Sequence, residues 1–206
     1  MNIQQSKYND LISPLSKLVI SELQQRYLSF DGYFTRTLGD QIIQGLGPHN
    51  ITLNGKKTTV REELKEESLI IDSIKSDSGS LWMLYYLLNQ NKISYEYTLK
   101  PELARDNFIS KKDKIKRTVA VTYVAALFRK VRFGVADDVG RAARFILVYM
   151  IKAGAVILDR EIIDEVSSLR LSVDFGSFEF VVGELFGQIL NIQATGDKIG
   201  LLNLNF

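Results

Sequence analysis

Cysteine is absent from this sequence of 206 residues, and histidine occurs once, as His49. Without cysteine the chain forms no disulfides and offers no thiolate ligands to a metal. The sequence also has no Gly-x-Ser-x-Gly motif and no second histidine that could act as a base beside a serine. These absences exclude a serine hydrolase of that kind.

An excess of one charge is missing as well. The 26 lysines and arginines nearly balance the 24 aspartates and glutamates, so the formal net charge is only +2. This balance gives no electrostatic reason to expect nucleic acid as a partner. The basic cluster at 111–117 is interrupted by Asp113 and contains no aromatic residue. We expect this cluster to form a solvated loop and the start of a helix.

Long apolar runs and phosphate-binding loops are lacking too. No segment reaches the roughly 20 uninterrupted apolar residues that a membrane span requires, and the first residues do not resemble a signal peptide. The sequence therefore predicts a soluble, cytoplasmic protein without a membrane partner. Gly45 and Gly47 end a helical pattern rather than begin one, which argues against a phosphate loop.

Apolar residues are plentiful, at 46% of the chain, and they suffice for the core of one domain spanning 1–206. Most of them recur at helical spacing. We expect helices over 7–27, 31–44, 59–89, 119–133, 137–153 and 177–194. A hairpin around Asn54-Gly55 and two short strands within 155–175 complete the prediction. The predicted fold is mostly α, a compact multi-helix domain with minor short β elements.

Several helix ends can be predicted from single residues. Asp31 is a suitable N-cap for the helix over 31–44. Thr59 and Glu62 have the spacing of a capping box, which begins the helix that runs to 89. The serine-rich stretch 76–80 is a weak point at which we expect that helix to kink.

Two helices near the middle of the chain stand out by their apolar composition. The segments 119–133 and 137–153 are hydrophobic on nearly every face, so we expect both to be central to the fold. Residues 90–110 are predicted to be irregular, with a short helical turn starting at Pro101. The tail 201–206 is expected to pack or fray.

Within the helix over 31–44, Asp40, Gln41 and Gln44 have the spacing of the zinc-peptidase motif His-Glu-x-x-His, but not its residues. The flanking sequence resembles the dipeptidyl peptidase III family of zinc exopeptidases, in its microbial branch with this five-residue motif. The resemblance lies in the segments 29–31, 45–50, 54–61, 127–134, 172–175 and 192–197. It covers about 27–199, and 1–26 is expected to form an N-terminal helix.

The resemblance implies where the zinc site of the family would lie. The first zinc-binding histidine falls on Asp40, the catalytic glutamate on Gln41 and the second histidine on Gln44. The third ligand, a glutamate on the next helix, falls on Ser73, and a substrate-binding histidine falls on Val139. An amide cannot act as a general base near pH 7, and an amide with a hydroxyl is a poor donor set for zinc. We therefore expect no cofactor and no catalysis.

Other uses of these residues remain open. Asp40, Asp72 and Asp77 could face one another and hold Mg²⁺ or Ca²⁺, or the acids could be paired with Lys75 and solvent. His49 matches a family histidine outside the zinc set, so a structural or surface role is expected. The following residues are expected to line a cleft for a ligand or partner: Asp40, Gln41, Gln44, His49, Asp72, Ser73, Asp77 and Arg141.

These observations favour a catalytically inactive peptidase homologue that binds a peptide or protein. The family enzymes place peptide between two lobes, and the resemblance covers one of them. We therefore expect a homo-oligomer or another partner to cover the open half of the cleft. A zinc-dependent exopeptidase with a rebuilt metal site and a small-ligand binder that uses the vacated cavity are the alternatives.

Overall fold

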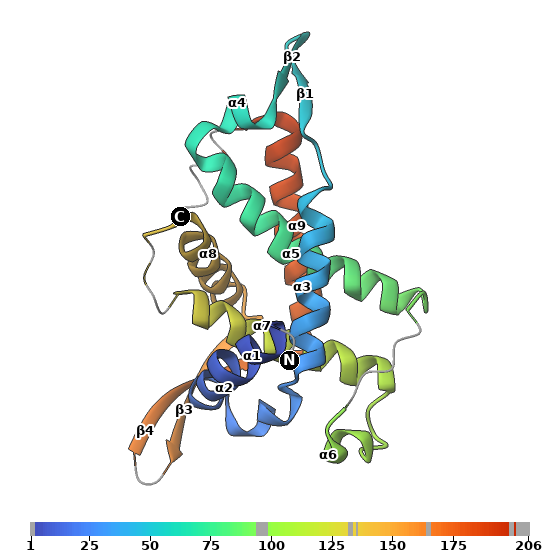
Figure 1. Ribbon diagram of the computed structural model, residues 1–206, viewed down its shortest axis with the longest axis vertical. Coiled ribbons are helices and arrows are strands. Elements are labelled where there is room, and N and C mark those ends of the chain that lie inside the picture. The colour runs from blue at the N-terminus through green and yellow to red at the C-terminus, as the bar shows by residue number, and fades with distance from the viewer. Residues whose placement is uncertain are drawn as a thin grey trace.

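The computed structural model describes residues 3–93, 99–131, 134, 136–163, 166–197 and 200, and most of them are helical (Figure 1). The α-helices are α1 (Ile3–Lys7), α2 (Ser13–Val19), α3 (Phe30–Gln44), α4 (Val60–Leu64), α5 (Ser68–Asn89), α6 (Pro101–Ala104), α7 (Lys111–Val131), α8 (Asp138–Lys152) and α9 (Phe178–Thr195). Two antiparallel hairpins pair β1 (Asn50–Leu53) with β2 (Lys56–Thr59) and β3 (Val156–Ile163) with β4 (Val166–Val173). The prediction of a mostly α fold with minor β elements is confirmed.

Three long helices, α3, α5 and α9, pack along one another, with α5 touching both of the others (Figure 1). Small residues at the contacts allow these helices to pack closely. A Cβ added to Gly39 of α3 would lie 3.1 Å from Ser80 Cβ of α5. A Cβ added to Gly79 of α5 would lie 2.5 Å from the ring of Phe186 on α9. The helix that carries the predicted zinc motif, α3, is therefore held directly against the helix that carries Ser73.

Helix α7 forms the centre of the core, as predicted for 119–133, although it begins earlier, at Lys111. All side chains from Thr118 to Leu127 are buried, which fits a helix covered on every side. The equivalent prediction for 137–153 is wrong. Helix α8 is one-sided: Ala142 and Ile146 are fully buried, while Val139 and Val148 are substantially exposed. Its exposed face leaves Val139 open to the candidate site.

The N-terminal helix predicted over 7–27 is interrupted. A π-helical turn, Tyr8–Ile12, lies between α1 and α2, and a 3₁₀ helix, Glu22–Tyr27, follows. Ile20, between α2 and the 3₁₀ helix, has an extended backbone and is fully buried. It forms a β-bridge with Leu171 of β4, and the neighbouring Ser21 amide donates to the Leu171 carbonyl at 2.9 Å. This contact with a strand far along the chain overrides the local helical pattern.

The helix predicted over 59–89 is divided into α4 and α5 by a 3₁₀ turn, Lys65–Glu67, where Lys65 has φ of +51°. The capping box of Thr59 and Glu62 is present, as predicted. Helix α5 continues through 76–80, where a kink was expected, without interruption. The Ser78 and Ser80 hydroxyls donate to carbonyls one turn back, which satisfies these buried groups within the helix.

Two further local predictions need correction. Ser29, not Asp31, is the N-cap of α3, since its hydroxyl accepts from the Gly32 amide at 3.0 Å. The basic cluster at 111–117 is the first two turns of α7 rather than a loop, and Lys114 within it is buried, with Nζ 3.4 Å from the Ala104 carbonyl. The tail 201–206 lies outside the described residues.

The predicted hairpin around Asn54-Gly55 forms, and the two strands predicted within 155–175 pair as a second hairpin. Asn54 and Gly55 adopt positive φ between β1 and β2, as a tight turn requires. The strands predicted within 155–175 are longer than expected, with eight residues each, and they extend away from the helices at the lower left of Figure 1. In the described ranges no helix is both long and apolar enough to cross a bilayer.

Candidate functional site

Three of the residues singled out by the sequence, one each from α3, α5 and α8, line one cavity between these helices. A cavity of about 520 Å³ is lined by Gln44, Leu69, Asp72, Ser73, Ser76, Asp137, Asp138 and Val139. It therefore brings together two of the predicted zinc-ligand positions, Gln44 and Ser73, with the predicted substrate position Val139. A smaller cavity of about 200 Å³ shares Asp137 and Val139 with it and continues toward α7.

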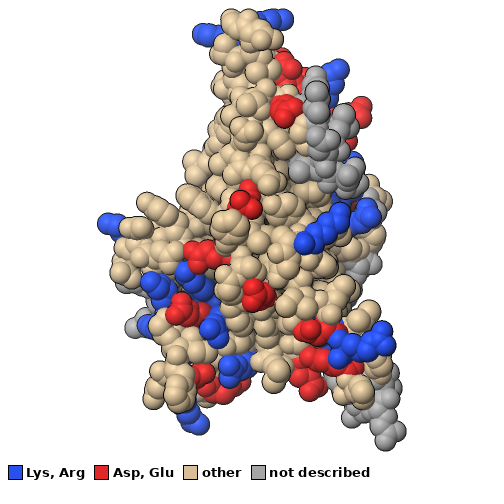
Figure 2. Space-filling view, turned by 180° about the vertical axis from the view of Figure 1, so that it is seen from behind, with Lys and Arg blue, Asp and Glu red and all other residues tan. Residues whose placement is uncertain are grey.

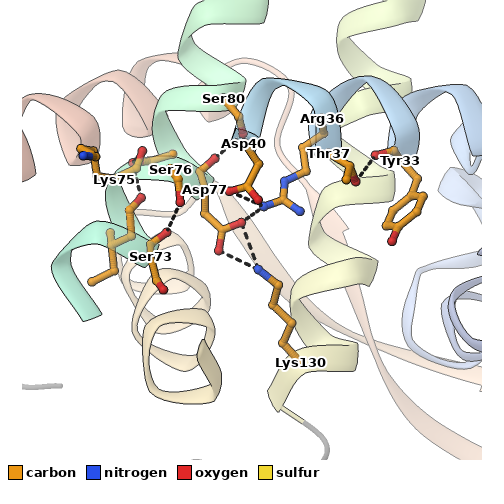
Figure 3. Close-up of polar contacts among 12 residues, drawn as sticks. Tyr33, Arg36, Thr37, Asp40, Ser73, Lys75, Ser76, Asp77, Ser80 and Lys130 are labelled. Carbon is orange, nitrogen blue, oxygen red and sulfur yellow. Dashed lines mark hydrogen bonds and ion pairs between the residues drawn. The ribbon is translucent and has the colours of Figure 1, made fainter. Parts of the chain in front are cut away.

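Asp40 is turned away from these cavities into a buried cluster of charges (Figure 3). The Arg36 guanidinium, one helical turn earlier on α3, lies 3.5 Å from the Asp40 carboxylate and also pairs with Asp77 of α5. Lys130 of α7 donates to both oxygens of Asp77, at 2.9 and 3.1 Å. Arg36 and Asp77 are almost fully buried. Three helices are thus joined by two cations and two carboxylates.

Burial sets the electrostatics of this cluster. Desolvation, with help from the nearby positive charge of Arg36, lowers the pKa of Lys130 to about 7, although Asp40 opposes the shift. Asp77 is shared between the two cations, since it contacts both Arg36 and Lys130. Beneath the cluster the Tyr123 ring lies 5.5 Å from the Arg36 guanidinium, and burial raises the pKa of its hydroxyl.

Asp72 does not join Asp40 and Asp77. Its carboxylate accepts from Gln193 of α9 at 2.8 Å and lies 3.3 Å from Lys75 Nζ. Lys75, itself buried, also donates to the Leu46 carbonyl at 2.9 Å and so secures the segment after α3. The predicted three-acid cation site therefore does not assemble, whereas the pairing of Asp72 with Lys75 is present.

The remaining predicted residues lie at the edge of the site. Gln41 and His49 are exposed, and the His49 ring lies 3.4 Å from the Gly45 carbonyl. Arg141 of α8 lies 3.4 Å from Glu67 and 3.6 Å from Asp138. These contacts place Arg141 between α8 and the turn before α5.

The side chains at this junction do not fit a catalytic zinc. Such a site needs three nitrogen, sulfur or carboxylate ligands directed at one point. Gln44 offers an amide, Ser73 a hydroxyl, and Asp40 is already paired with Arg36. Among the described residues no group of three His, Cys, Asp or Glu side chains is placed to hold a metal.

Sequence reasoning missed Arg36 and Lys130, the two cations of the buried cluster. The sequence contains one feature that could have indicated each of them. Arg36 stands four residues before Asp40 on a helix that also carries apolar residues at helical spacing. Lys130 lies at the end of a helix predicted to be buried on every face, where a charge needs a partner.

Charge on the surface follows the composition. On the face seen in Figure 2, lysines and arginines alternate with aspartates and glutamates near the lower end, and no extended area of one sign appears.

Comparison with solved structures identifies the fold. The chain superimposes on the dipeptidyl peptidase III of Caldithrix abyssi with a TM-score of 0.82 and 28% sequence identity, over 98% of this chain and 34% of that one. The dipeptidyl-peptidase III of Corallococcus sp. strain EGB gives a TM-score of 0.81 and 28% identity, over 98% and 33%. The fold is therefore dipeptidyl peptidase III-like, as the sequence resemblance implied.

Among curated proteins, Nudix hydrolase 3 of Arabidopsis thaliana is 30% identical over 198 residues, which are 96% of this chain and 22% of that protein. No protein-family model matches the chain. The chain thus spans about a third of the length of the two solved structures and about a fifth of the curated relative. The name of that relative describes a much longer protein and conflicts with the peptidase-like fold, so it assigns no activity to this region.

Proposed function

We propose that this chain is a catalytically inactive, dipeptidyl peptidase III-like module that binds a peptide or protein through the cleft formed by α3, α5 and α8. One observation carries the proposal. Gln44, Ser73 and Val139 line one cavity, at the positions where the resemblance puts two zinc ligands and a substrate-binding histidine. The scaffold of the site is kept while its chemistry is replaced.

The residue types support binding rather than hydrolysis. Gln41 stands where the family has its catalytic glutamate, and a neutral amide cannot take a proton from water near pH 7. Asp40 stands where the first histidine is expected, and its negative charge is satisfied by Arg36 rather than by a metal. What remains is a cleft of mixed polarity that can hold a ligand without attacking it.

The assignment of positions can be tested by restoring the ligands. We expect the purified chain to carry no stoichiometric zinc in elemental analysis and to release no dipeptides from short peptides. The triple variant Asp40→His, Gln44→His, Ser73→Glu should bind close to one zinc per chain, because it restores the three donors that the resemblance implies and removes the ion pair that holds residue 40 to Arg36. The double variant without Ser73→Glu is the matched control and should bind zinc more weakly.

Two results would overturn these assignments. Stoichiometric zinc and dipeptide release by the unaltered chain would show an active peptidase with a rebuilt site. Failure of the folded triple variant to bind zinc, with helical content unchanged by circular dichroism, would show that residues 40, 44 and 73 do not share a site.

The cleft wall is also proposed as the surface that a second copy or another protein covers. Val139 is 47% exposed beside the cavities, and Val148, on the same helix, is 38% exposed away from them. We expect light scattering after size exclusion to detect self-association that Val139→Lys weakens and Val148→Lys leaves unchanged. A monomer at all concentrations would exclude the second copy as the partner.

A small ligand is a second candidate because the larger cavity, about 520 Å³, falls within the range of about 300–1,000 Å³ that ligand sites occupy. A thermal-shift screen would separate the two candidates. A compound that binds only the native state raises the melting temperature, and this rise should disappear when Ser73 is replaced by a bulkier residue, as in Ser73→Phe.

A further inference from the structure

The smaller cavity lies beside a local excess of positive charge. Lys7 of α1 is close enough to Arg36, Arg129 and Lys130 that, after burial, their charges contribute to lowering its pKa. Against these four cations the buried cluster supplies two carboxylates, Asp40 and Asp77. Both carboxylates are taken by Arg36 and Lys130. The positive charge is therefore not balanced by the acids of this cluster.

These acids leave two cations without a carboxylate of the cluster, Lys7 and Arg129, and Arg129 is the one that lines the smaller cavity. In the part of the chain that the structure describes, no carboxylate lies within ion-pair distance of its guanidinium, and its buried Nε has no hydrogen-bond partner. A buried donor without a partner is unfavourable, by about 1–3 kcal/mol in general. The Arg129 guanidinium therefore has hydrogen-bond donors that an acceptor from outside the chain could use.

The space for such an acceptor is present. The cavity of about 200 Å³ is lined by Arg129 and Lys130 together with Gly134, Ala136, Asp137, Val139 and Gly140. Two of these residues are glycines, which leave room close to the backbone. Asp137 is the one acid in this set, and its carboxylate is engaged as the N-cap of α8, accepting from the Gly140 amide at 2.6 Å. The N-terminus of α8 is thus already capped by Asp137. The groups in this cavity that can bind an anion are the side chains of Arg129 and Lys130.

We propose that this cavity binds a compact oxyanion, a carboxylate or a phosphate, through the Arg129 guanidinium with support from the Lys130 ammonium. The planar fork of arginine matches two oxygens of either group and forms the stronger, charge-assisted kind of hydrogen bond. The cavity shares the lining residues Asp137 and Val139 with the larger one, so an oxyanion held there would lie next to the cleft and could anchor a ligand in it. This inference rests on the proposed function only for the source of the oxyanion.

Calorimetric titration of the full chain tests the inference at constant ionic strength with three probes: inorganic phosphate, a tripeptide with a free carboxyl terminus, and the same tripeptide amidated. We expect at least one oxyanion probe to bind, and Arg129→Gln to weaken it by on the order of tenfold or more. Arg144→Gln is the matched control, since it removes the same charge from the exposed face of α8. It should change binding less than twofold.

The outcomes are distinct. Binding of phosphate alone, lost in Arg129→Gln, supports the oxyanion site and contradicts a peptide ligand. Binding of the free tripeptide over its amide, lost in Arg129→Gln, supports both. Peptide binding that Arg129→Gln does not change, equal losses in the two arginine variants, or no binding of any probe would overturn the oxyanion site. If Arg129→Gln fails to fold, Arg129→Lys keeps the charge without the fork and should weaken binding to an intermediate extent.

Discussion

At the scale of single residues, the main electrostatic feature beside the candidate site is the buried charge cluster. Arg36 and Lys130 bring two positive charges to the junction of α3, α5 and α7, and Asp40 and Asp77 bring two negative ones. The cluster is thus neutral as a set, and no bound cation is needed to balance its carboxylates. Buried ion pairs of this kind add little net stability, but they are costly to break.

Replacing one partner of this cluster should therefore destabilise the fold. In Asp77→Asn, the Arg36 guanidinium and the Lys130 ammonium lose the carboxylate that both contact. We expect the free energy of unfolding to fall by about 3 kcal/mol, since uncompensated charge is left in the interior. Urea denaturation measures this loss.

Asp138→Asn provides the comparison for that measurement. Asp138 also pairs with an arginine, Arg141, but both side chains are more than a third exposed. Exposed pairs contribute about 0–1 kcal/mol, so this variant should lose no more than that. Equal losses in the two variants would contradict the account of the buried cluster.

The pH dependence of stability should reflect Lys130. Burial lowers its pKa in the folded chain from 10.5 to about 7. Between pH 7 and pH 10.5 the unfolded chain therefore binds more protons than the folded chain, and stability must rise with pH. Below pH 7 both states hold the proton, so the full cost of burying the charge is present.

The expected rise from this residue is at most about 1.4 kcal/mol per pH unit. Urea denaturation at pH 7, 8 and 9 measures it, and Lys130→Met should remove this part of the rise, since the variant has no amine to titrate. A stability that falls with pH in the unaltered chain, or a slope that Lys130→Met leaves unchanged, would show that the ammonium is not disfavoured by burial. The carboxylates of Asp77 and Asp40 would then outweigh both the desolvation of the amine and the repulsion from Arg36 and Arg129.

At the scale of elements, the packing of α5 against its neighbours depends on one glycine. A Cβ at position 79 would lie 2.5 Å from the Phe186 ring of α9 and 2.9 Å from Ile43 Cγ2 of α3. Gly79→Ala should therefore cost about 1–3 kcal/mol by overpacking, although alanine is the better helix former. Thermal unfolding measures the loss.

Gly187→Ala is the matched control because it lies in α9 with no atom within 4 Å of the added Cβ. There only helix propensity changes, and the variant should gain up to about 1 kcal/mol. Stabilisation by both substitutions would contradict the close approach of α3, α5 and α9.

Elements with local signals could be predicted, and elements set by distant contacts could not. The capping box at Thr59 and the Asn54-Gly55 turn depend on neighbouring residues, and both were found. The break at Ile20 depends on Leu171, about 150 residues later, and periodicity gave no sign of it. The one-sidedness of α8 likewise depends on which neighbours cover it.

The residues of the candidate site likewise fall into those that the sequence indicated and those that depend on distant contacts. The spacing of Asp40 and Gln44 and the resemblance of their flanks placed Gln44, Ser73 and Val139, which the fold brings to one cavity. The partners of Asp40 and Asp77 could not be predicted, since Arg36 and Lys130 meet them only after α3, α5 and α7 pack. The spacing on α3 and the resemblance thus indicated residues that meet at the candidate site, while tertiary packing determined its electrostatics.

At the scale of the whole molecule, the helical body and the β3–β4 hairpin differ in how firmly they are held. Side chains 118–127 of α7 are all buried, whereas Ile162 near the tip of the hairpin is 78% exposed. A hairpin of two strands is marginal by itself, so its stability must come from the end that touches the body. Local opening should therefore start at the tip and stop at that junction.

Hydrogen exchange followed residue by residue tests this gradient. Amides of α7 should exchange only through global unfolding, and those near Ile162 and Ser167 should exchange fastest within the hairpin.

At the base of the hairpin, the Gln24 side chain donates to the Val173 carbonyl and accepts from the Val173 amide, both at 2.8 Å, which attaches β4 to the segment before α3. Gln24→Ala removes both bonds, so fast exchange should spread along the strands to Val156 and Val173. Exchange in α7 should stay at its original rate. If α7 accelerates together with the hairpin, the molecule opens as one cooperative unit, and the hairpin is part of the body that supports the cleft.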